Sequence, residues 1–343
     1  PRIVPPWEVI GELTPAAARD CGLKAGTPIA AGAGDQAAGM MGAAMVEPGL
    51  VFDVAGTASV FAICVDQFVP DVEHKTLFTA RLVPEDLWYA LAYINGGGLN
   101  LRWFRDELAF EIQEDAEAKG ENEYVLLDRL AAQVGPGSDG LLFLPHLQGR
   151  VCPSDADVRG LWMGFSWAHR KPHFYRAIVE GVAYEYAYYL GIEKAILPEA
   201  EFKEARVIGG GARSQFWNQI KADVSGKQII KMKHGEAASL GAAILGAVSC
   251  GFYDSVEQAC EKQLAENRAR VIVAQGAQLE RAQEMVSRLV ELAPLIVRSA
   301  ERAVHHRADG RQHTGTLYPI DRLRRNLERQ VQLAAFEQQP RQA

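Results

Sequence analysis

Residues 206–229 read RVIGGGARSQFWNQIKADVSGKQI, and this stretch places a strand, a glycine turn and a helix in direct succession. The segment 205–208 predicts a short strand, because it leads into three consecutive glycines. Ser214 then opens a segment to Val224 that predicts a helix, and another strand is expected at 227–232. Successive units of this kind favour an α/β fold.

The same order of strand, glycine turn and helix recurs elsewhere in the chain. A strand at 27–31 leads through Gly32 and Gly34 into a small-residue helix that reaches about Val46. Other elements are expected as strands at 50–54, 59–65, 88–94 and within 140–150, and as helices at 99–110, 171–195 and 236–246. Because ligands of α/β folds bind at the carboxyl ends of strands, the glycine turns are the candidate binding elements.

The net charge, the apolar runs and the cysteine pattern of the chain limit the kinds of partner and cellular environment that it fits. The chain has 343 residues and a formal net charge of −7, which argues against nucleic acid or an anionic membrane as the main partner. No apolar run approaches the roughly 18 residues that a membrane span needs. The five cysteines are scattered without a CxxC pair, which fits reduced thiols in a cytoplasmic protein.

The stretch AAGAGDQAAG at 30–39 allows three interpretations. Gly32, Gly34 and Ala37, followed by Asp53, match the dinucleotide-binding fingerprint formally. That match is weak, because Asp35 would place a negative charge beside the pyrophosphate that such a turn binds. Asp35 is alternatively the N-cap of the following helix, or it is itself a reacting group.

Two further glycine turns carry a similar ambiguity. The turn Gly56-Thr57-Ala58-Ser59 sets a hydroxyl beside an accessible backbone, and the turn 209–213 precedes a helix N-terminus. Either turn can approach a phosphate or a flat base, and either one taken alone also fits an ordinary tight turn. The sequence contains neither a Walker-type phosphate loop nor the motif set of protein kinases.

Five segments, in order, resemble the FGGY family of carbohydrate kinases over about residues 5–260. Among members of that family, the xylulose kinases have the motifs that are most similar to those of this sequence. The segments are GAGDQAAGMMGAAMVEPG with the following GTAS, NGGGLNLRWFRDEL, the long stretch 141–185, RVIGGGARSQFWNQIKADVSGKQI, and GEAASLGAAILGA. Several segments in the correct order are more specific than any single motif.

The resemblance implies an actin-like, ribonuclease H-like α/β fold in which two domains enclose a cleft. It implies that Asp35 is the catalytic aspartate, taking a proton from a sugar hydroxyl as that oxygen attacks the γ-phosphate of ATP. ATP and Mg²⁺ are the implied cofactors, with the metal ligands unassigned. The remaining implied contacts are Gln36 to the sugar, and Gly56, Thr57, Gly98, Gly210, Gly211 and Gln215 to the nucleotide.

The chain departs from the family pattern in three places, of which one is the segment after about residue 270, which does not resemble the usual tyrosine-bearing end of the family. The N-terminal kinase domain, which begins with a D-x-G-T phosphate loop, is missing, so the chain is expected to be the C-terminal half and poorly active alone. The usual G-E-R-x-P appears as Gly149-Arg150-Val151-Cys152-Pro153. We therefore expect a domain end and linker at 1–26, the C-terminal, nucleotide-binding domain at 27–270, a helix at 271–305 and a loosely ordered basic tail at 306–343.

The leading functional hypothesis is phosphorylation of a ketopentose, xylulose to xylulose 5-phosphate. Ribulose, another ketose, or a polyol such as erythritol or glycerol remains open, because the missing half would supply most sugar contacts. Two other classes are a non-catalytic actin-like nucleotide-binding protein and, resting on Gly32 and Asp53, a dinucleotide-dependent oxidoreductase. A homodimer is a further possibility that the sequence leaves open.

Overall fold

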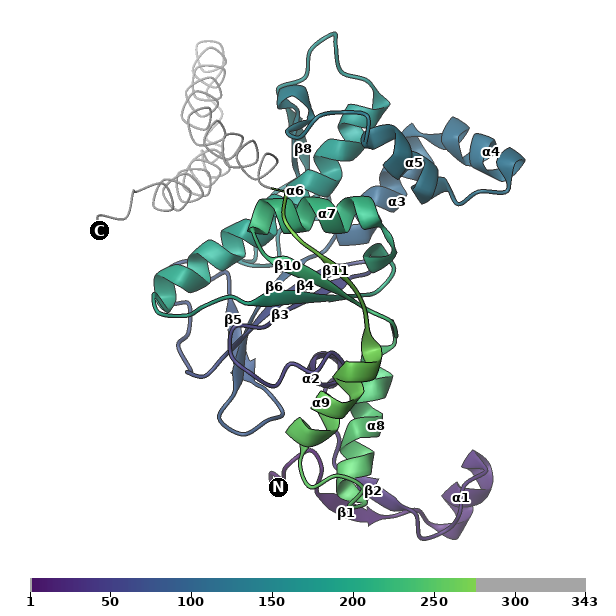
Figure 1. The fold of residues 1–343 in the computed structure, drawn as a ribbon, viewed down its shortest axis with the longest axis vertical. Helices are drawn as coiled ribbons and strands as arrows, with labels where there is room; N and C mark the ends of the chain where they lie inside the picture. Colours follow the sequence, from purple (N-terminus) through teal and green to yellow (C-terminus); the bar gives the residue numbers. More distant parts are fainter. Residues whose placement is uncertain (1, 276–343) are drawn as a thin grey trace, which may run out of the picture.

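A seven-stranded sheet forms the centre of the chain (Figure 1). A computed structural model describes residues 2–275, and the expectations for 276–343 lie outside this described part. The strand order is β11-β10-β9-β3-β4-β6-β5. The strands are β3 (Val51–Ala55), β4 (Ser59–Val65), β5 (Phe78–Arg81), β6 (Trp88–Ile94), β9 (Glu204–Ile208), β10 (Gln228–Met232) and β11 (Arg268–Ile272).

The strand directions bring several strand ends to one edge of the sheet. Strands β10, β9 and β3 are parallel, whereas β3, β4, β6 and β5 alternate in direction. Strand β6 therefore runs in the same direction as β3. The carboxyl ends of β3, β6, β9 and β10 consequently meet at the same edge, where α/β folds bind ligands.

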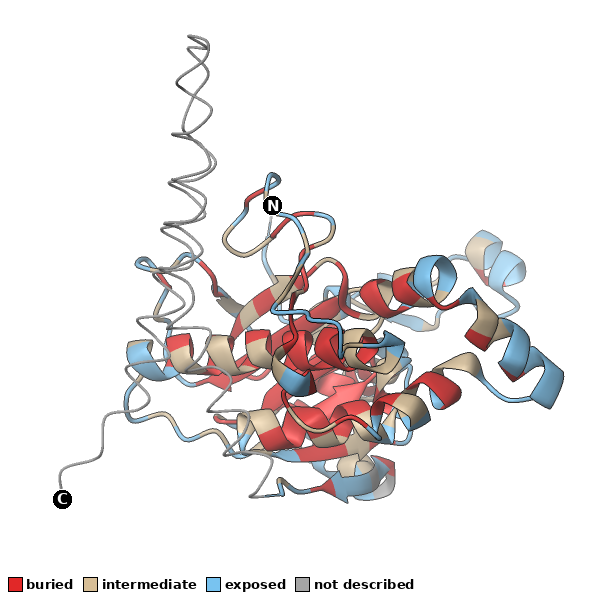
Figure 2. Cartoon of the chain, turned by 90° about the horizontal axis from the view of Figure 1, so that it is seen from above, coloured by how far each residue is buried: buried red, intermediate tan, exposed pale blue. Residues whose placement is uncertain are grey.

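Helices cover both faces of the sheet (Figures 1 and 2). On β3, Val51 and Ala55 point toward the first face and Phe52 toward the second, because side chains alternate along a strand. The first face carries α3 (Gly97–Leu108), α4 (Phe110–Lys119), α5 (Glu123–Ala131), α6 (Lys171–Ile196) and α7 (Gln215–Ser225). The second carries α2 (Asp35–Gly42), α8 (Ala237–Ser249) and α9 (Val256–Asn267).

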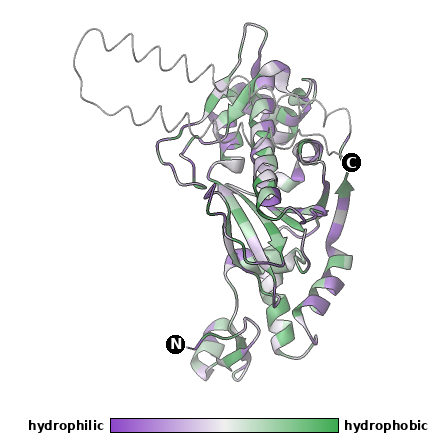
Figure 3. Ribbon diagram, turned by 90° about the vertical axis from the view of Figure 1, so that its left-hand side faces the viewer, coloured by the Kyte–Doolittle hydropathy of each residue, from purple (hydrophilic) through white to green (hydrophobic). Residues whose placement is uncertain are grey.

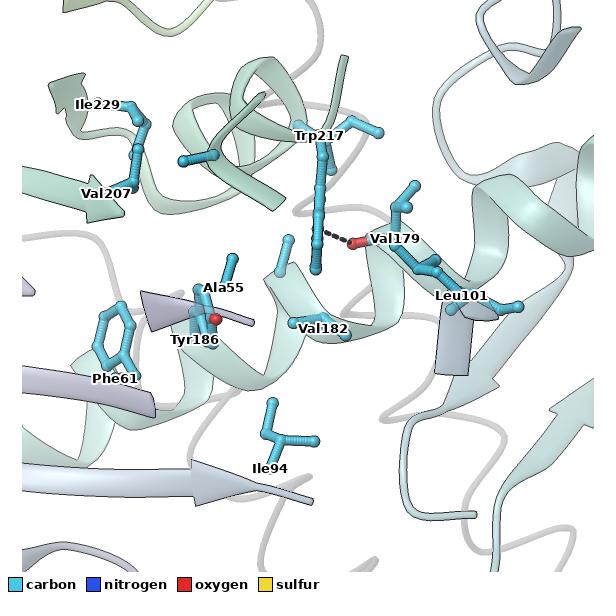
Figure 4. Packing of buried hydrophobic residues seen from close by; sticks show 14 of the residues in the cluster. Ala55, Phe61, Ile94, Leu101, Val179, Val182, Tyr186, Val207, Trp217 and Ile229 are labelled. Atoms are coloured by element: carbon cyan, nitrogen blue, oxygen red, sulfur yellow. Dashed lines mark hydrogen bonds between the residues drawn. The ribbon is translucent and has the colours of Figure 1, made fainter. Parts of the chain in front are cut away.

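Trp217 of α7 is the largest fully buried side chain of the first face. Its indole Nε1 donates a hydrogen bond of 3.1 Å to the Val179 carbonyl of α6 (Figure 4). Burial of the large ring and pairing of its one polar atom stabilise the contact between the two helices. Figure 3 shows hydrophobic segments both on the central strands and on the helices around them.

Smaller elements lie outside the main sheet. Strands β1 (Val9–Glu12) and β2 (Pro28–Ala30) form an antiparallel pair of their own, with α1 (Pro15–Cys21) between them. A second antiparallel pair joins β7 (Leu142–Leu144) to β8 (Leu161–Met163), and short 3₁₀ turns occur at Ser138–Gly140 and Gly211–Arg213. Within residues 2–275, no helix is both long and apolar enough to cross a membrane.

The expected α/β organisation is confirmed, with the main strands and helices close to their predicted bounds. Strands β4 and β6 and the start of α6 coincide with the prediction, whereas α2 ends at Gly42, before the expected Val46. The sequence did not predict β1, β5, β8, β11, α4, α5 or α9.

Helices α2 and α8 pack with almost no side chain between them. A Cβ added at Gly241 of α8 would lie 1.8 Å from the Ala38 carbonyl oxygen of α2. The same geometry recurs at Gly42, where a Cβ would lie 1.9 Å from the Ala237 carbonyl oxygen. Glycine on each helix therefore sets the distance between α8 and the helix that carries Asp35.

We predict that Gly241→Ala destabilises the fold by about 2–3 kcal/mol, because the new methyl group forces two backbones apart. Gly246→Ala on the same helix is the matched control, since no atom lies within 4 Å of its added Cβ. That control should gain up to about 1 kcal/mol from helix propensity. Denaturant unfolding measures both, and equal stability of Gly241→Ala and the wild type would contradict the packing argument.

Glu193 of α6 is a carboxyl group in the interior. It is 2% exposed, and its Oε2 has no hydrogen-bond partner. Burial, with the Asp71 charge as a second cause, raises the pKa of Glu193 from 4.5 to about 7. Because the folded pKa exceeds the unfolded one, the stabilising contribution of this group is complete below about pH 4.5 and is lost as the pH rises through about 7.

We predict that Glu193→Gln removes this pH dependence. Relative to the variant, the wild type should lose stability between pH 5 and pH 8, by an amount on the order of 2 kcal/mol. Glu199→Gln, at an exposed position shortly after the helix, is the control and should follow the wild type. Parallel stability curves for wild type and Glu193→Gln across this range would refute the assignment.

Candidate nucleotide site

Three glycine turns meet at the carboxyl edge of the sheet. The first, 56–58, follows β3, and the second, 95–98, follows β6. The backbone amide of Gly98 donates to the Gly56 carbonyl at 2.9 Å, and the amide of Leu99 donates to the Thr57 carbonyl at 2.9 Å. These two bonds join the first turn to the N-terminus of α3.

The third turn, 209–213, follows β9 and lies against the first. A Cβ at Gly209 would stand 2.8 Å from the Ala55 carbonyl oxygen, and the φ of +84° at this residue also favours glycine. At Gly98 a Cβ would stand 2.3 Å from the Gly56 carbonyl oxygen, so the second turn is equally close to the first. The three turns thus form one backbone surface that tolerates no side chain at its contacts.

Part of this surface is open. Gly210 and Thr57 are exposed, and an added Cβ at Gly210 would meet no atom within 4 Å. Backbone groups at such a surface can approach a phosphate or a flat ring closely. The structure therefore brings Gly56, Thr57, Gly98, Gly210 and Gly211 to one edge of the sheet.

The N-terminus of α7 continues directly from the third turn. Ser214 is its N-cap, and its Oγ accepts the Trp217 amide at 2.9 Å. Gln215 is the first residue of the helix, and its Oε1 accepts a hydrogen bond of 2.9 Å from Arg270 of β11. If Gln215 contacts the nucleotide as predicted, its side chain would bind both the nucleotide and Arg270 of the edge strand β11.

Asp35 lies on a different element, at the start of α2. The N-cap position belongs to Gly34, so the alternative interpretation of Asp35 as the N-cap does not hold. Its Oδ1 accepts the amide of Gln36 at 2.8 Å, and the residue is exposed. Its charge is felt at Tyr89, whose pKa is raised by burial and then by Asp35.

Asp35 and Gln36 are not joined to the three turns by any hydrogen bond or ion pair found within residues 2–275. Helix α2 lies on the second face of the sheet, with Gly39 against the ring of Phe52. A substrate bridging both parts is therefore required if they act together.

The loop 145–155 supports the second turn from the side. The Asn100 Nδ2 donates to the Pro145 carbonyl at 3.1 Å, and the buried Glu185 of α6 contacts His146 at 3.2 Å. Burial alone would raise the pKa of Glu185, but His146 and Arg150 outweigh it and lower that pKa to about 2. Arg150, which stands where the family pattern has Glu, therefore acts as a buried counter-charge.

The dinucleotide hypothesis does not fit the structure. Strand β2, which precedes the Gly32 turn, pairs antiparallel with β1 and lies outside the main sheet, whereas a dinucleotide turn needs a parallel βαβ unit. Asp53 is 1% exposed. Its carboxylate accepts from Lys221 Nζ at 2.5 Å and from the Tyr186 hydroxyl at 2.7 Å, so it is unavailable to a ribose.

A metal centre is not formed by the described residues alone. Residues 2–275 contain no group of three or more His, Cys, Asp or Glu side chains that could hold a metal ion.

The sheet, its helices and its glycine turns define an α/β domain, and sequence comparison identifies the family. Residues 53–250 match the C-terminal domain of the FGGY family of carbohydrate kinases. The chain therefore belongs to the FGGY family of carbohydrate kinases.

Similar proteins over most of this chain are carbohydrate kinases by name. The gluconokinase of Bacillus subtilis is 32% identical over 258 residues, which is 75% of this chain and 50% of the relative. A xylulose kinase of Staphylococcus epidermidis is 33% identical over 262 residues, which is 76% of this chain and 50% of the relative. The chain thus spans about half the length of these relatives.

Solved structures show the same fold. The xylulose kinase from Rhodospirillum rubrum superposes with a TM-score of 0.71 at 27% identity, covering 86% of this chain and 58% of that protein. The fold is accordingly the actin-like ATPase fold of the FGGY kinases, as the resemblance implied.

We predict that Lys221→Met destabilises the chain by about 3–5 kcal/mol, because it leaves the Asp53 carboxylate buried and unpaired. The double variant Asp53→Leu/Lys221→Met removes both charges and should recover at least half of that loss. Urea unfolding of the three proteins measures the effect. A double variant less stable than Lys221→Met alone would contradict a buried pair of this kind.

Proposed function

We propose that this chain is the nucleotide-binding half of a carbohydrate kinase that transfers the γ-phosphoryl group of ATP to a sugar hydroxyl. The observation that carries the proposal is the convergence of three glycine turns at one edge of the sheet, with Gly210 and Thr57 exposed there. Membership of a carbohydrate kinase family supports it. The domain boundaries 27–270 belong to the same proposal.

In this proposal, the turn at Gly56 and Thr57 contacts the phosphates of ATP, and the turn at Gly210 and Gly211 contacts the adenosine. Backbone amides suit phosphate oxygens, and a side-chain-free surface suits a flat base. Gly98 keeps the second turn close enough to the first for both to face one ligand. Magnesium, when bound to the phosphates, would supply neutralisation of their developing charge.

Asp35 is the proposed general base. Its carboxylate would accept the proton of the sugar hydroxyl while that oxygen bonds to the γ-phosphorus and the bond from the γ-phosphorus to the β-phosphate oxygen breaks, releasing ADP. Its exposure at the start of α2 leaves its second oxygen accessible to a substrate. Gln36 is the adjacent candidate for a hydrogen bond to the sugar.

The sugar itself is the finer part of the proposal. Xylulose and gluconate are the first candidates, because relatives named for each are about equally similar to this chain. Both are small polyhydroxylated substrates with a primary hydroxyl that can accept a phosphoryl group. The half that these relatives carry in addition would supply further sugar contacts and the second wall of the cleft.

A panel of D-xylulose, D-gluconate, D-ribulose, erythritol and glycerol tests the substrate, with ATP as donor and the chain joined to the N-terminal half that we propose. ADP release above the rate without sugar identifies the acceptor. Parallel titrations of the chain with ATP and NAD test the nucleotide. Tight NAD binding without ATP binding would overturn the kinase proposal.

We predict that Asp35→Asn lowers the turnover of this kinase by about 10²–10⁴, because a general base is lost. ATP affinity should change little, since no hydrogen bond or ion pair within residues 2–275 links Asp35 to the glycine turns. Asp86→Asn, at a fully exposed aspartate, is the matched control and should keep full activity. Unchanged turnover in Asp35→Asn would refute the role of Asp35.

A further inference from the structure

Asp128 of α5 holds the N-terminus of α7 through a serine. Its Oδ2 accepts the Ser214 hydroxyl at 2.7 Å, and its Oδ1 accepts the Tyr175 hydroxyl of α6 at 3.1 Å. One carboxylate thereby connects three helices, α5, α6 and α7. No motif in the sequence pointed to this residue, which lies 86 positions from Ser214.

The bond to Asp128 determines how Ser214 caps α7. A hydroxyl has one proton to donate, and here it is directed to Asp128, so a lone pair remains to accept the Trp217 amide at 2.9 Å. Without an acceptor at Asp128, the hydroxyl is free to rotate and the cap weakens. The carboxylate acceptor also makes this bond stronger than one between neutral groups.

Ser214 also follows the third glycine turn directly. Its backbone amide donates to the Gly211 carbonyl at 3.1 Å, and the Asn218 side chain donates to the Ala212 carbonyl at 2.9 Å. A cap that fixes Ser214 therefore fixes the position of Gly210 and Gly211 relative to α7. The opposite side of the turn already rests against β3 at Ala55.

We propose that Asp128 is a positioning residue for the turn 209–213, keeping its exposed backbone in the geometry that receives the adenosine of ATP. This inference rests on the proposed function for the identity of the ligand. The ordering of the turn by Asp128 is independent of the proposed function, because it is a property of the chain without ligand. Asp128 acts through Ser214 and does not itself touch the nucleotide.

The first experiment needs no ligand. Amide hydrogen exchange at Trp217 reports the Ser214 cap directly, because this amide donates to the Ser214 hydroxyl. Asp128→Ala and Ser214→Ala should each speed this exchange by about tenfold, the size of effect expected from loss of a helix cap. Asp128→Asn should stay within about threefold of the wild type, because an amide oxygen still accepts the hydroxyl.

Tyr175→Phe is the matched control. It removes the other hydroxyl from the same carboxylate and leaves the Ser214 bond in place. Its Trp217 exchange should match the wild type even if its melting temperature falls. Unchanged exchange in Asp128→Ala, or equal acceleration in Tyr175→Phe, would show a general stabilising role and overturn the proposal.

The second experiment titrates the same proteins with adenosine. Affinity should fall about tenfold in Asp128→Ala and in Ser214→Ala, with the double variant no weaker than either, because both remove one interaction. Asp128→Asn should restore most of the affinity. Additive losses in the double variant would contradict action through Ser214.

The two experiments separate this inference from the proposed function. If the wild type binds no adenosine while the exchange pattern follows the expectation, the nucleotide assignment fails and the positioning of the turn by Asp128 stands. If adenosine binds equally well to wild type and Asp128→Ala, the positioning role in binding fails and the nucleotide assignment stands.

Discussion

The buried ion pair between Asp53 and Lys221 joins the two parts of the chain on which the candidate site depends. Asp53 lies on β3, whose last residue, Ala55, directly precedes the turn 56–58. Lys221 lies on α7, which follows the turn 209–213. Both side chains are almost fully buried, and Lys221 Nζ also sits 4.3 Å from the Trp217 ring. Charges removed from water are tolerated only when paired, so the pair restricts how α7 can sit on the sheet.

The backbone contacts at the carboxyl edge are the second constraint. Gly98 and Gly209 bring the turns after β6 and β9 against the turn after β3, at distances that exclude a side chain. The hydrogen bonds from Gly98 and Leu99 then hold the first two turns together. A ligand at this edge would meet backbone groups whose positions are set by the sheet, and such a surface needs little rearrangement to bind.

Much of the fold could be predicted from the sequence. Strands β4 and β6 and helix α6 were predicted because continuous apolar runs and glycine breaks mark them locally. Edge strands β5 and β11, and the short helices α4 and α5, were missed because they are stabilised by pairing or packing that no local pattern reveals. Trp217 is buried, whereas Trp167 is fully exposed, a difference that the residue type alone does not reveal.

The family, the α/β class and the glycine positions can all be inferred from local residue order and from five segments that occur in the family's order. The partners of the acidic side chains, in contrast, depend on the folded structure. Asp53 faces the core and meets Lys221 across 168 residues, and Asp128 meets Ser214 across 86, pairings that only the strand register and helix packing create. The residue type fixes the charge of a side chain, but the partner of that charge depends on which distant elements the core brings into contact.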